Sequence, residues 1–403
     1  MKILNKQLHY FNPGHETAVQ SGMIYYTPTA SVRKMMTDLG LLPLWYGENG
    51  DYILVDESID SSAFLNTLPE VLRPDIRSVT PADLQEPAVF QEPIEAFPWG
   101  LSPQSIRIFE NIQKKQPSLA VPQWNQELTH LISRQTAAGY LEQVQRQLPE
   151  FNQITRPRFC TNIAEIKQFM SAYPPPYVLK MPYSCSGRGL YWINTCQVDT
   201  LATQWIEGAI KRQGVVSIEP VVDKVCDFAL EFVSDGRGQV EYLGISIFET
   251  LEKGAFSGNR LGNQEALTRK VTKYIPDSHL QTLRQTLKDI LSEKIGMTYK
   301  GHLGVDMLVY RSGSSFAVHP FIELNLRYTM GLVALQLSQR FIHPSSSGQF
   351  IVNYDKDAWH NHTRMLTTYP LQLREGKIHH GYFPLCPVSP ETNYRAYILA
   401  INN

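Results

Sequence analysis

Two carboxylates, an amide and a guanidinium stand at strand spacing in the last third of the chain. Glu323, Asn325 and Arg327 alternate with apolar residues, so the period of two in a strand puts all three on one face. The turn sequence at 311–315 predicts a hairpin, which brings Asp306 of the preceding strand over that face. Such oxygens are ligands that Mg²⁺ prefers, and a guanidinium beside the ion suits a transferring phosphoryl group. Taken alone, however, so short a pattern favours a solvated strand face.

A lysine and a glycine-containing loop form a second group of residues upstream. Lys180 ends the apolar segment 177–180, where an ammonium is costly unless it has a partner. The loop 183–189 contains Gly187 and Gly189, and it can offer backbone N–H groups to a polyphosphate that Lys180 also reaches. Its spacing excludes a P-loop and a dinucleotide-binding fingerprint. A plain β-hairpin connection is the alternative interpretation.

A third segment joins an apolar strand to a carboxylate. The strand at 215–219 ends in Glu219, and the stiff segment 220–222 and Asp227 follow. The backbone of such a segment can bind adenine, with the carboxylates near the exocyclic amine or the ribose. A buried strand capped by a surface acid is the alternative, and it is favoured when the segment is taken alone.

The elements that position these residues fall into successive patterns. Residues 1–125 predict a small parallel sheet wrapped by helices, with strands at 8–11, 41–45 and 52–55 and a helix at 32–39. The fold class expected from this alternation is α/β.

A second pattern begins near residue 126 and continues to residue 340. It divides into a first subdomain at 126–222 and a second at 223–340, with a polar loop expected at 249–263. The remaining residues, 341–403, predict a strand-rich appendage.

The composition describes a globular protein without a strong electrostatic preference. Hydrophobic residues make up 43% and charged residues 19%, and the net charge is −1, so no partner nucleic acid or anionic membrane surface is indicated. The five cysteines form no CxxC pair, and no run approaches the ~20 apolar residues of a membrane span. With no signal peptide in the sequence, the expected compartment is the cytoplasm.

In this order and at these separations, the three segments resemble the ATP-grasp superfamily over about residues 126–340. In that family a strand lysine precedes the glycine-rich loop over the triphosphate, and an acid on one strand is followed by E-x-N on the next. The resemblance implies an N-terminal α/β domain, a two-subdomain ATP-grasp unit and a short C-terminal appendage. It also implies that ATP lies between the two halves of the central unit.

The resemblance assigns roles to individual residues. Asp306, Glu323 and Asn325 match the ligands of Mg²⁺, with Mn²⁺ as an alternative ion. Arg327 and Lys180 match catalytic positions. The positions matched to ATP are Arg134, Lys180, Ser184, Ser186, Gly187, Arg188, Gly189, Glu219, Pro220, Val221, Val222 and Asp227. Two departures are Arg134, where the family usually has a lysine, and Gly304, where some branches have an arginine.

The activity that the resemblance implies is a ligase that forms a carbon–nitrogen bond. Such an enzyme activates a small-molecule or peptide carboxylate as an acyl-phosphate for attack by an amine or another nucleophile. A small-molecule kinase and a nucleotide-binding protein without turnover are the alternatives. Retention of the whole set of metal ligands argues against the last.

Two further segments are candidates for substrate contacts. His15 and Glu16 follow the first predicted strand, where open α/β sheets place ligands, although a turn and a helix start explain them equally well. Lys253 lies in the predicted polar loop, for which a solvated loop is the favoured interpretation.

Overall fold

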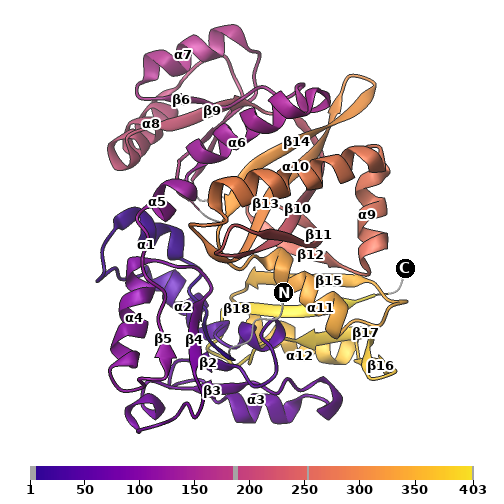
Figure 1. Ribbon diagram of the computed structural model, residues 1–403. Coiled ribbons are helices and arrows are strands. Elements are labelled where there is room, and N and C mark those ends of the chain that lie inside the picture. Colours follow the sequence, from indigo (N-terminus) through magenta and orange to yellow (C-terminus); the bar gives the residue numbers. More distant parts are fainter. Residues whose placement is uncertain (1–5, 185–188, 252–253, 402–403) are drawn as a thin grey trace. The chain divides into compact units, whose positions relative to one another are not determined.

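The computed structural model describes residues 6–184, 189–251 and 254–401, and these form two compact units (Figure 1). The first unit contains the described residues of Met1–Asn125, Ser257–Gln264 and Met330–Asn403. The second contains those of Gln126–Phe256 and Glu265–Thr329. The first unit therefore includes residues of both the predicted N-terminal domain and the predicted C-terminal appendage.

A parallel sheet forms the N-terminal part of the first unit. Its strands pair in the order β3-β2-β1-β4-β5. Their bounds are β1 Lys6–Tyr10, β2 Tyr52–Leu54, β3 Arg77–Val79, β4 Ile94–Pro98 and β5 Leu119–Ala120. The accompanying helices are α1 His15–Ser21, α2 Ala30–Asp38, α3 Ser61–Thr67 and α4 Pro103–Gln113. Apolar side chains such as Leu8, Ile94 and Phe109 fill the core of this sheet. The predicted parallel α/β unit is confirmed.

The strand order reverses at β1, so β1 and β4 form the point of the sheet where such folds bind ligands. There Asn12 and Gly100 exchange hydrogen bonds, from the Asn12 amide to the Gly100 carbonyl (2.8 Å) and from the Gly100 N–H to Asn12 Oδ1 (3.1 Å). His15 Nδ1 lies 3.1 Å from Glu16 Oε2, and both side chains are buried. A Cβ at Gly100 would lie 2.2 Å from the His15 ring, so these residues are closely packed.

The C-terminal residues of the first unit form an antiparallel sheet with helices. Its strands pair in the order β12-β15-β18-β17-β16. Their bounds are β12 Phe256–Leu261, β15 Gly348–Tyr354, β16 Gln372–Arg374, β17 Lys377–Pro384 and β18 Tyr394–Ala400. The helices of this part are α11 Met330–Arg340 and α12 Ala358–Thr368.

Two sequence predictions of local structure are wrong in this unit. Residues 41–45 were expected to form a strand, but Leu42–Trp45 is a 3₁₀ helix with Pro43 in its first turn, where the missing N–H costs nothing. Residues 249–263 were expected to form a loop, but β12 lies inside that range because it pairs with β15, a partner distant in sequence.

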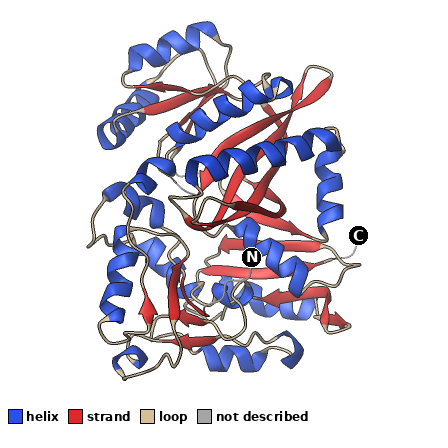
Figure 2. Cartoon of the chain, viewed as in Figure 1, coloured by secondary structure: helices blue, strands red, loops and turns tan. Residues whose placement is uncertain are grey.

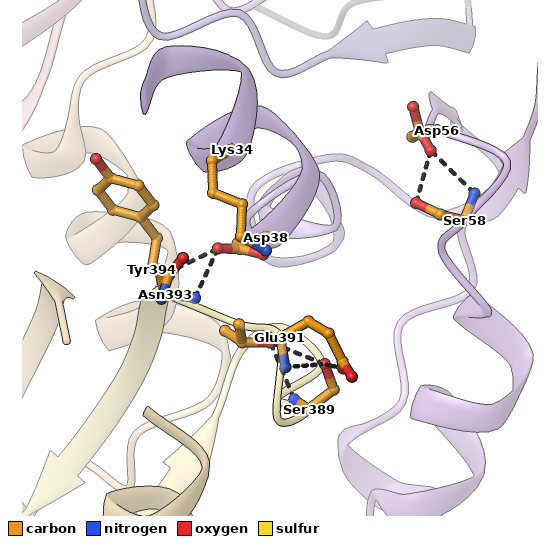
Figure 3. Close-up of polar contacts among 9 residues, drawn as sticks. Lys34, Asp38, Asp56, Ser58, Ser389, Glu391, Asn393 and Tyr394 are labelled. Carbon is orange, nitrogen blue, oxygen red and sulfur yellow. Dashed lines mark hydrogen bonds and ion pairs between the residues drawn. The ribbon is translucent and has the colours of Figure 1, made fainter. Parts of the chain in front are cut away.

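Side chains from the two ends of the chain meet inside the first unit. The Trp45 indole N–H donates to the Leu385 carbonyl (2.6 Å), and its ring packs edge-on against Phe383. The Asp38 carboxylate at the end of α2 accepts from the backbone N–H groups of Asn393 and Tyr394, each at 2.9 Å, as Figure 3 shows. The C-terminal residues are therefore part of the folded core of this unit.

The second unit begins with two helices and an antiparallel sheet. The helices are α5 Glu127–Leu131 and α6 Arg134–Gln147, and the sheet has the order β6-β9-β7-β8. Its strands are β6 Arg158–Cys160, β7 Tyr177–Lys180, β8 Leu190–Ile193 and β9 Val216–Pro220, and its helices are α7 Ile163–Ala172 and α8 Thr200–Gln213. Leu179 and Ile218 pack with Phe169 of α7 and Ile206 of α8 in one core. Because side chains alternate along a strand, Lys180 and Glu219 point to the opposite face.

A second antiparallel sheet in this unit has the order β14-β13-β10-β11 and contains the long hairpin visible in Figure 2. Its strands are β10 Asp223–Asp235, β11 Val240–Thr250, β13 Lys300–Ser312 and β14 Ser315–Asn325, and its helices are α9 Gln264–Thr272 and α10 Asp277–Ile295. The hairpin predicted at 311–315 joins β13 to β14. Among the described residues, no helix is both long and apolar enough to cross a membrane.

Candidate nucleotide and metal site

The carboxylates and the amide predicted as metal ligands lie together on the hairpin. Asp306 on β13 pairs in register with Glu323 on β14, and Gly304 pairs with Asn325. The Asn325 side chain is buried and forms a hydrogen bond with Asp306. An irregularity in the register of the ladder follows Asp306. Asp306, Glu323 and Asn325 therefore form one group, as the strand spacing indicated.

The electrostatics of this group favour a bound cation. Burial, with the neighbouring carboxylates of Glu323 and Glu231, raises the pKa of Asp306 to about 8 against the opposing effects of Arg327 and Asn325. A divalent cation would relieve this repulsion. In the described part of the chain, no three His, Cys, Asp or Glu side chains are close enough to hold a metal by themselves. Two carboxylates and an amide suit Mg²⁺, which keeps waters and phosphate oxygens as its other ligands.

Glu231 is a third carboxylate near this group, and the sequence analysis did not select it. It is 1% exposed on β10 and accepts hydrogen bonds from Ser246 Oγ (2.9 Å) and Thr329 Oγ1 (2.8 Å). Burial raises its pKa to about 7, although these hydroxyl groups oppose the rise. The sequence signal that could have identified it is the presence of a glutamate inside the apolar run 228–233.

The same glutamate explains why glycine stands at position 304. A Cβ on Gly304 would lie 2.7 Å from Glu231 Oε2 and 3.0 Å from Thr329 Cγ2. The Glu231 carboxylate therefore occupies the space that a side chain at 304 needs. An arginine, which some ATP-grasp branches have at this position, does not fit.

Lys180 and Glu219 form a buried ion pair on the first sheet of the unit. They come from neighbouring strands, since Lys180 pairs with Ser217 and Val178 pairs with Glu219. Their side chains are 15% and 10% exposed. Burial opposes ionisation of Glu219, but the charge and hydrogen bond of Lys180, with the charge of Arg134, lower the pKa of the carboxyl group. Lys180 thus has the partner that a lysine at the end of a buried strand needs.

Arg134 connects the loop after β7 with the carboxylates of the hairpin. Its Nη1 donates to the Met181 carbonyl (2.7 Å) and to Ser184 Oγ (2.6 Å). Its Nη2 donates to Glu323 Oε2 (2.9 Å), and the side chain is 10% exposed. One guanidinium therefore contacts the start of the predicted phosphate loop and a predicted metal ligand.

The described ends of the predicted phosphate loop are held together. The Met181 N–H donates to the Gly189 carbonyl (2.9 Å). A Cβ on Gly189 would lie 2.3 Å from Ser184 Cβ, so this close approach requires glycine. Ser186, Gly187 and Arg188, predicted to contact ATP, lie outside the described residues, as does Lys253.

The remaining predicted residues occupy the end of β9, the start of β10 and the segment after β14. The Val221 N–H, between Pro220 and Val222, donates to the Pro176 carbonyl (2.9 Å), which fixes this segment. Asp227 accepts from Thr250 Oγ1 (3.0 Å) and pairs with Lys224 (2.5 Å). Arg327 Nη1 donates to the Tyr328 carbonyl (3.2 Å), and its charge acts on both Asp306 and Glu231.

A small cavity lies among the side chains of the second unit. Polar and aromatic groups share its lining, and Phe159 on β6 pairs in register with Ser217 on β9. Its lining residues are Arg134, Ala138, Pro157, Phe159, Lys180, Ser217, Glu219, His319, Phe321 and Ile322. His319 was missed by the sequence analysis. Its only signal was its spacing, four residues before Glu323 on the same strand face.

Several solved enzymes share this fold over nearly the whole chain, as the fold expected from the resemblance requires. Biotin carboxylase from Campylobacter jejuni matches with a TM-score of 0.54 and 11% identity, covering 98% of this chain and 87% of that enzyme. The biotin carboxylase domain of 2-oxoglutarate carboxylase from Hydrogenobacter thermophilus matches with a TM-score of 0.53 and 11% identity, covering 100% and 87%.

N5-carboxyaminoimidazole synthetase from Staphylococcus aureus, in complex with ADP, has a TM-score of 0.50 and 12% identity, covering 100% of this chain and 95% of that enzyme. No protein-family model and no curated protein matches the sequence. At these identities the comparisons establish the fold, and the chemistry must be argued from the site.

Proposed function

We propose that the chain is an ATP- and Mg²⁺-dependent ligase that activates a carboxylate as an acyl-phosphate for attack by an amine or another nucleophile. The observation that carries this proposal is the position of Arg134, which bonds both to Ser184 and to Glu323. A phosphate-binding loop and a carboxylate pair are of use to the same ligand only if they are this close. The ATP-grasp fold supports the same conclusion.

The residues of the second unit supply complementary contacts to the nucleotide. Lys180 and Arg134 offer positive charge to the phosphates, and Ser184 and Gly189 lie at the two ends of the loop assigned to them. The segment Glu219 to Val222 binds the base through its backbone, and Asp227 binds the ribose. Asp306, Glu323 and Asn325 would hold Mg²⁺ (or Mn²⁺), which would supply positive charge to the phosphates.

The chemistry consists of two displacement steps. An oxygen of the substrate carboxylate attacks the γ-phosphorus, the bond to the β-phosphate oxygen breaks, and ADP leaves. The nucleophile then attacks the acyl carbon and inorganic phosphate leaves with the bonding electrons. Arg327 stabilises the charge on the transferring phosphoryl group, and positioning by the site supplies much of the rate. The acid is a small-molecule or peptide carboxylate.

Calorimetric titration with ATP, with and without Mg²⁺, tests the nucleotide and metal site. The wild type is expected to bind ATP tightly only with Mg²⁺. Glu323→Gln combined with Asn325→Ala removes ligand oxygens and charge, so Mg²⁺-dependent binding should weaken by at least about 100-fold. Glu293→Gln, at an exposed position of α10, is the matched control and should bind as the wild type. A wild type that does not bind ATP contradicts the proposal.

A screen for ADP release then tests the reaction. A ligase releases ADP and phosphate only when both an acid and a nucleophile are present. Release with one substrate and a stable phosphorylated product would instead identify a small-molecule kinase. Tight ATP binding without release in any mixture would identify a nucleotide-binding protein without turnover.

A further inference from the structure

Two residues in the lining of the small cavity each have a buried polar atom without a hydrogen-bond partner among the described residues. The atoms are Nε of Arg134, on α6, and Nδ1 of His319, on β14. The other polar groups of the lining have partners, since Lys180 pairs with Glu219 and Ser217 Oγ donates to the Lys180 carbonyl (3.3 Å). A buried polar atom without a partner destabilises the folded protein, so these two atoms need an explanation.

The two atoms are complementary as hydrogen-bonding groups. Nε of Arg134 carries a hydrogen and can only donate. Burial, reinforced by the charge of Lys180, lowers the pKa of His319 to about 4, although the charge of Glu219 opposes this effect. The imidazole is therefore neutral at pH 7, and one of its ring nitrogens is an acceptor. In the described structure no bond joins the two atoms directly, so both would be satisfied by a group that accepts from Nε and donates to Nδ1.

The cavity that both residues line suits one water molecule. Its volume is about 10 Å³, which is about the space that a single water needs. Charged and polar side chains make up half of its lining, whereas a purely apolar cavity of this size would stay dry. A water there can accept from Arg134 Nε, donate to His319 Nδ1 and donate its second hydrogen to Ser217 Oγ. Three such bonds are typical of a buried water.

We propose that this cavity binds one water molecule, which bridges Arg134 Nε to His319 Nδ1 and makes His319 a positioning residue for the guanidinium. The Nη atoms of Arg134 already bond to Ser184 of the predicted phosphate loop and to Glu323, a predicted metal ligand. A bond at Nε fixes the third nitrogen, so the plane of the guanidinium is held where it offers its charge to the phosphates. The bridge depends on the fold alone, whereas its effect on phosphate binding rests on the proposed function.

Urea unfolding of paired variants tests the bridge. His319→Asn keeps an acceptor, because Oδ1 can stand where Nδ1 does, whereas His319→Leu has nearly the same shape without an acceptor. Arg134→Lys puts a methylene group in the place of Nε and so removes the donor. The ratio of the folding equilibrium constants of the Asn and Leu variants should be about tenfold larger in the wild-type background than in the Arg134→Lys background. An unchanged ratio overturns the bridge.

Calorimetry with ATP and with inorganic tripolyphosphate, each with Mg²⁺ at pH 7.5, tests the positioning role. His319→Leu should weaken the binding of both ligands by about fivefold, because the effect acts through the guanidinium that the phosphates contact. His319→Asn should bind both within about twofold of the wild type. The positioning role is overturned if His319→Leu binds both ligands as the wild type does, if it weakens ATP alone, or if His319→Asn is no better than His319→Leu.

His362→Leu is the matched control, since His362 is a half-buried histidine of the first unit that hydrogen-bonds Tyr382 (2.8 Å). It should leave the binding of both ligands unchanged. A wild type that binds neither ATP nor tripolyphosphate overturns the proposed function and the positioning role with it. The ratio from urea unfolding then still decides whether the water bridge exists, so the two failures are distinguishable.

Discussion

Asp306 on β13 lies directly opposite Glu323 on β14, and Asn325 two residues further along bonds to Asp306. Two carboxylates in register across an antiparallel pair repel each other. Here burial and the nearby Glu231 add to the repulsion, and the pKa of Asp306 rises to about 8. The repulsion between these carboxylates therefore destabilises the hairpin, and a bound cation would remove this effect.

Asp306→Asn is expected to change stability and metal binding in opposite directions. Without metal, the neutral amide removes a repelled carboxyl group, so the melting temperature at pH 8 should rise by a few degrees. With Mg²⁺ and ATP, the variant should bind at least about 100-fold more weakly, because a ligand charge is lost. Thermal melts with and without Mg²⁺-ATP measure both effects. A variant that is equally stabilised by Mg²⁺-ATP would contradict the assignment of Asp306 as a ligand.

Lys180→Met is expected to destabilise the second unit. It leaves the Glu219 carboxylate buried without its cation, and breaking a buried pair in this way costs about 3–5 kcal/mol. The double variant Lys180→Met with Glu219→Gln should recover much of that loss, because the uncompensated charge is gone. Urea unfolding of the single and double variants measures the coupling.

Lys294→Met serves as the control for this prediction. Its pair with Glu293 is exposed, 41% and 63%, so the free energy of unfolding should change by less than about 1 kcal/mol. Equal effects at positions 180 and 294 would show that the Lys180–Glu219 pair is not buried in solution.

The free energy of unfolding should depend on pH through His319, and the sign of this dependence follows from the lowered pKa of the ring. The folded-state pKa is about 4, below the unfolded value near 6.5, so the folded protein resists protonation. The folded protein is therefore most stable, with respect to this group, above pH 6.5, and its free energy of unfolding decreases as the pH falls from 6.5 toward 4. Between pH 6.5 and 4.5 the wild type should lose about 1–2 kcal/mol more stability than His319→Phe. Parallel unfolding curves of the two proteins across this range would contradict a buried neutral histidine.

Gly304→Ala tests the packing of Glu231 against the hairpin. The new Cβ would meet Glu231 Oε2 at 2.7 Å, and that carboxylate is held by Ser246 and Thr329. We expect a loss of about 1–3 kcal/mol from overpacking. Adding Glu231→Ala should relieve the clash, so the two changes together should cost less than the sum of their separate effects. Strict additivity in urea unfolding would show that residues 231 and 304 are not in contact.

Short-range patterns in the sequence were sufficient for the parts of the site that lie on one hairpin or one strand. The alternation at 323, 325 and 327 and the turn at 311–315 put Asp306 and Glu323 in register, because a hairpin is formed by residues close together in the chain. The apolar segment before Lys180 similarly indicated a buried strand with a charged end.

Contacts between residues far apart in sequence could not be predicted in this way. The local sequence predicts a strand at residues 41–45, but a 3₁₀ helix forms there. In it the Trp45 ring packs against Phe383, and its indole N–H donates to the Leu385 carbonyl. The local sequence predicts a loop at residues 249–263, because no pattern within that range indicates that β12 pairs with β15. Tertiary packing overrode local preference at both places.

The sequence by itself determined the carboxylate pair of the hairpin and the lysine at the end of a buried strand. Only the tertiary structure decided which side chains share a site. It joined Arg134 to Ser184 and Glu323, gave Lys180 its partner Glu219, and put Glu231 and His319 beside them. The physical reason is that strand period and turn chemistry act over a few residues, whereas burial and charge pairing depend on how sheets pack.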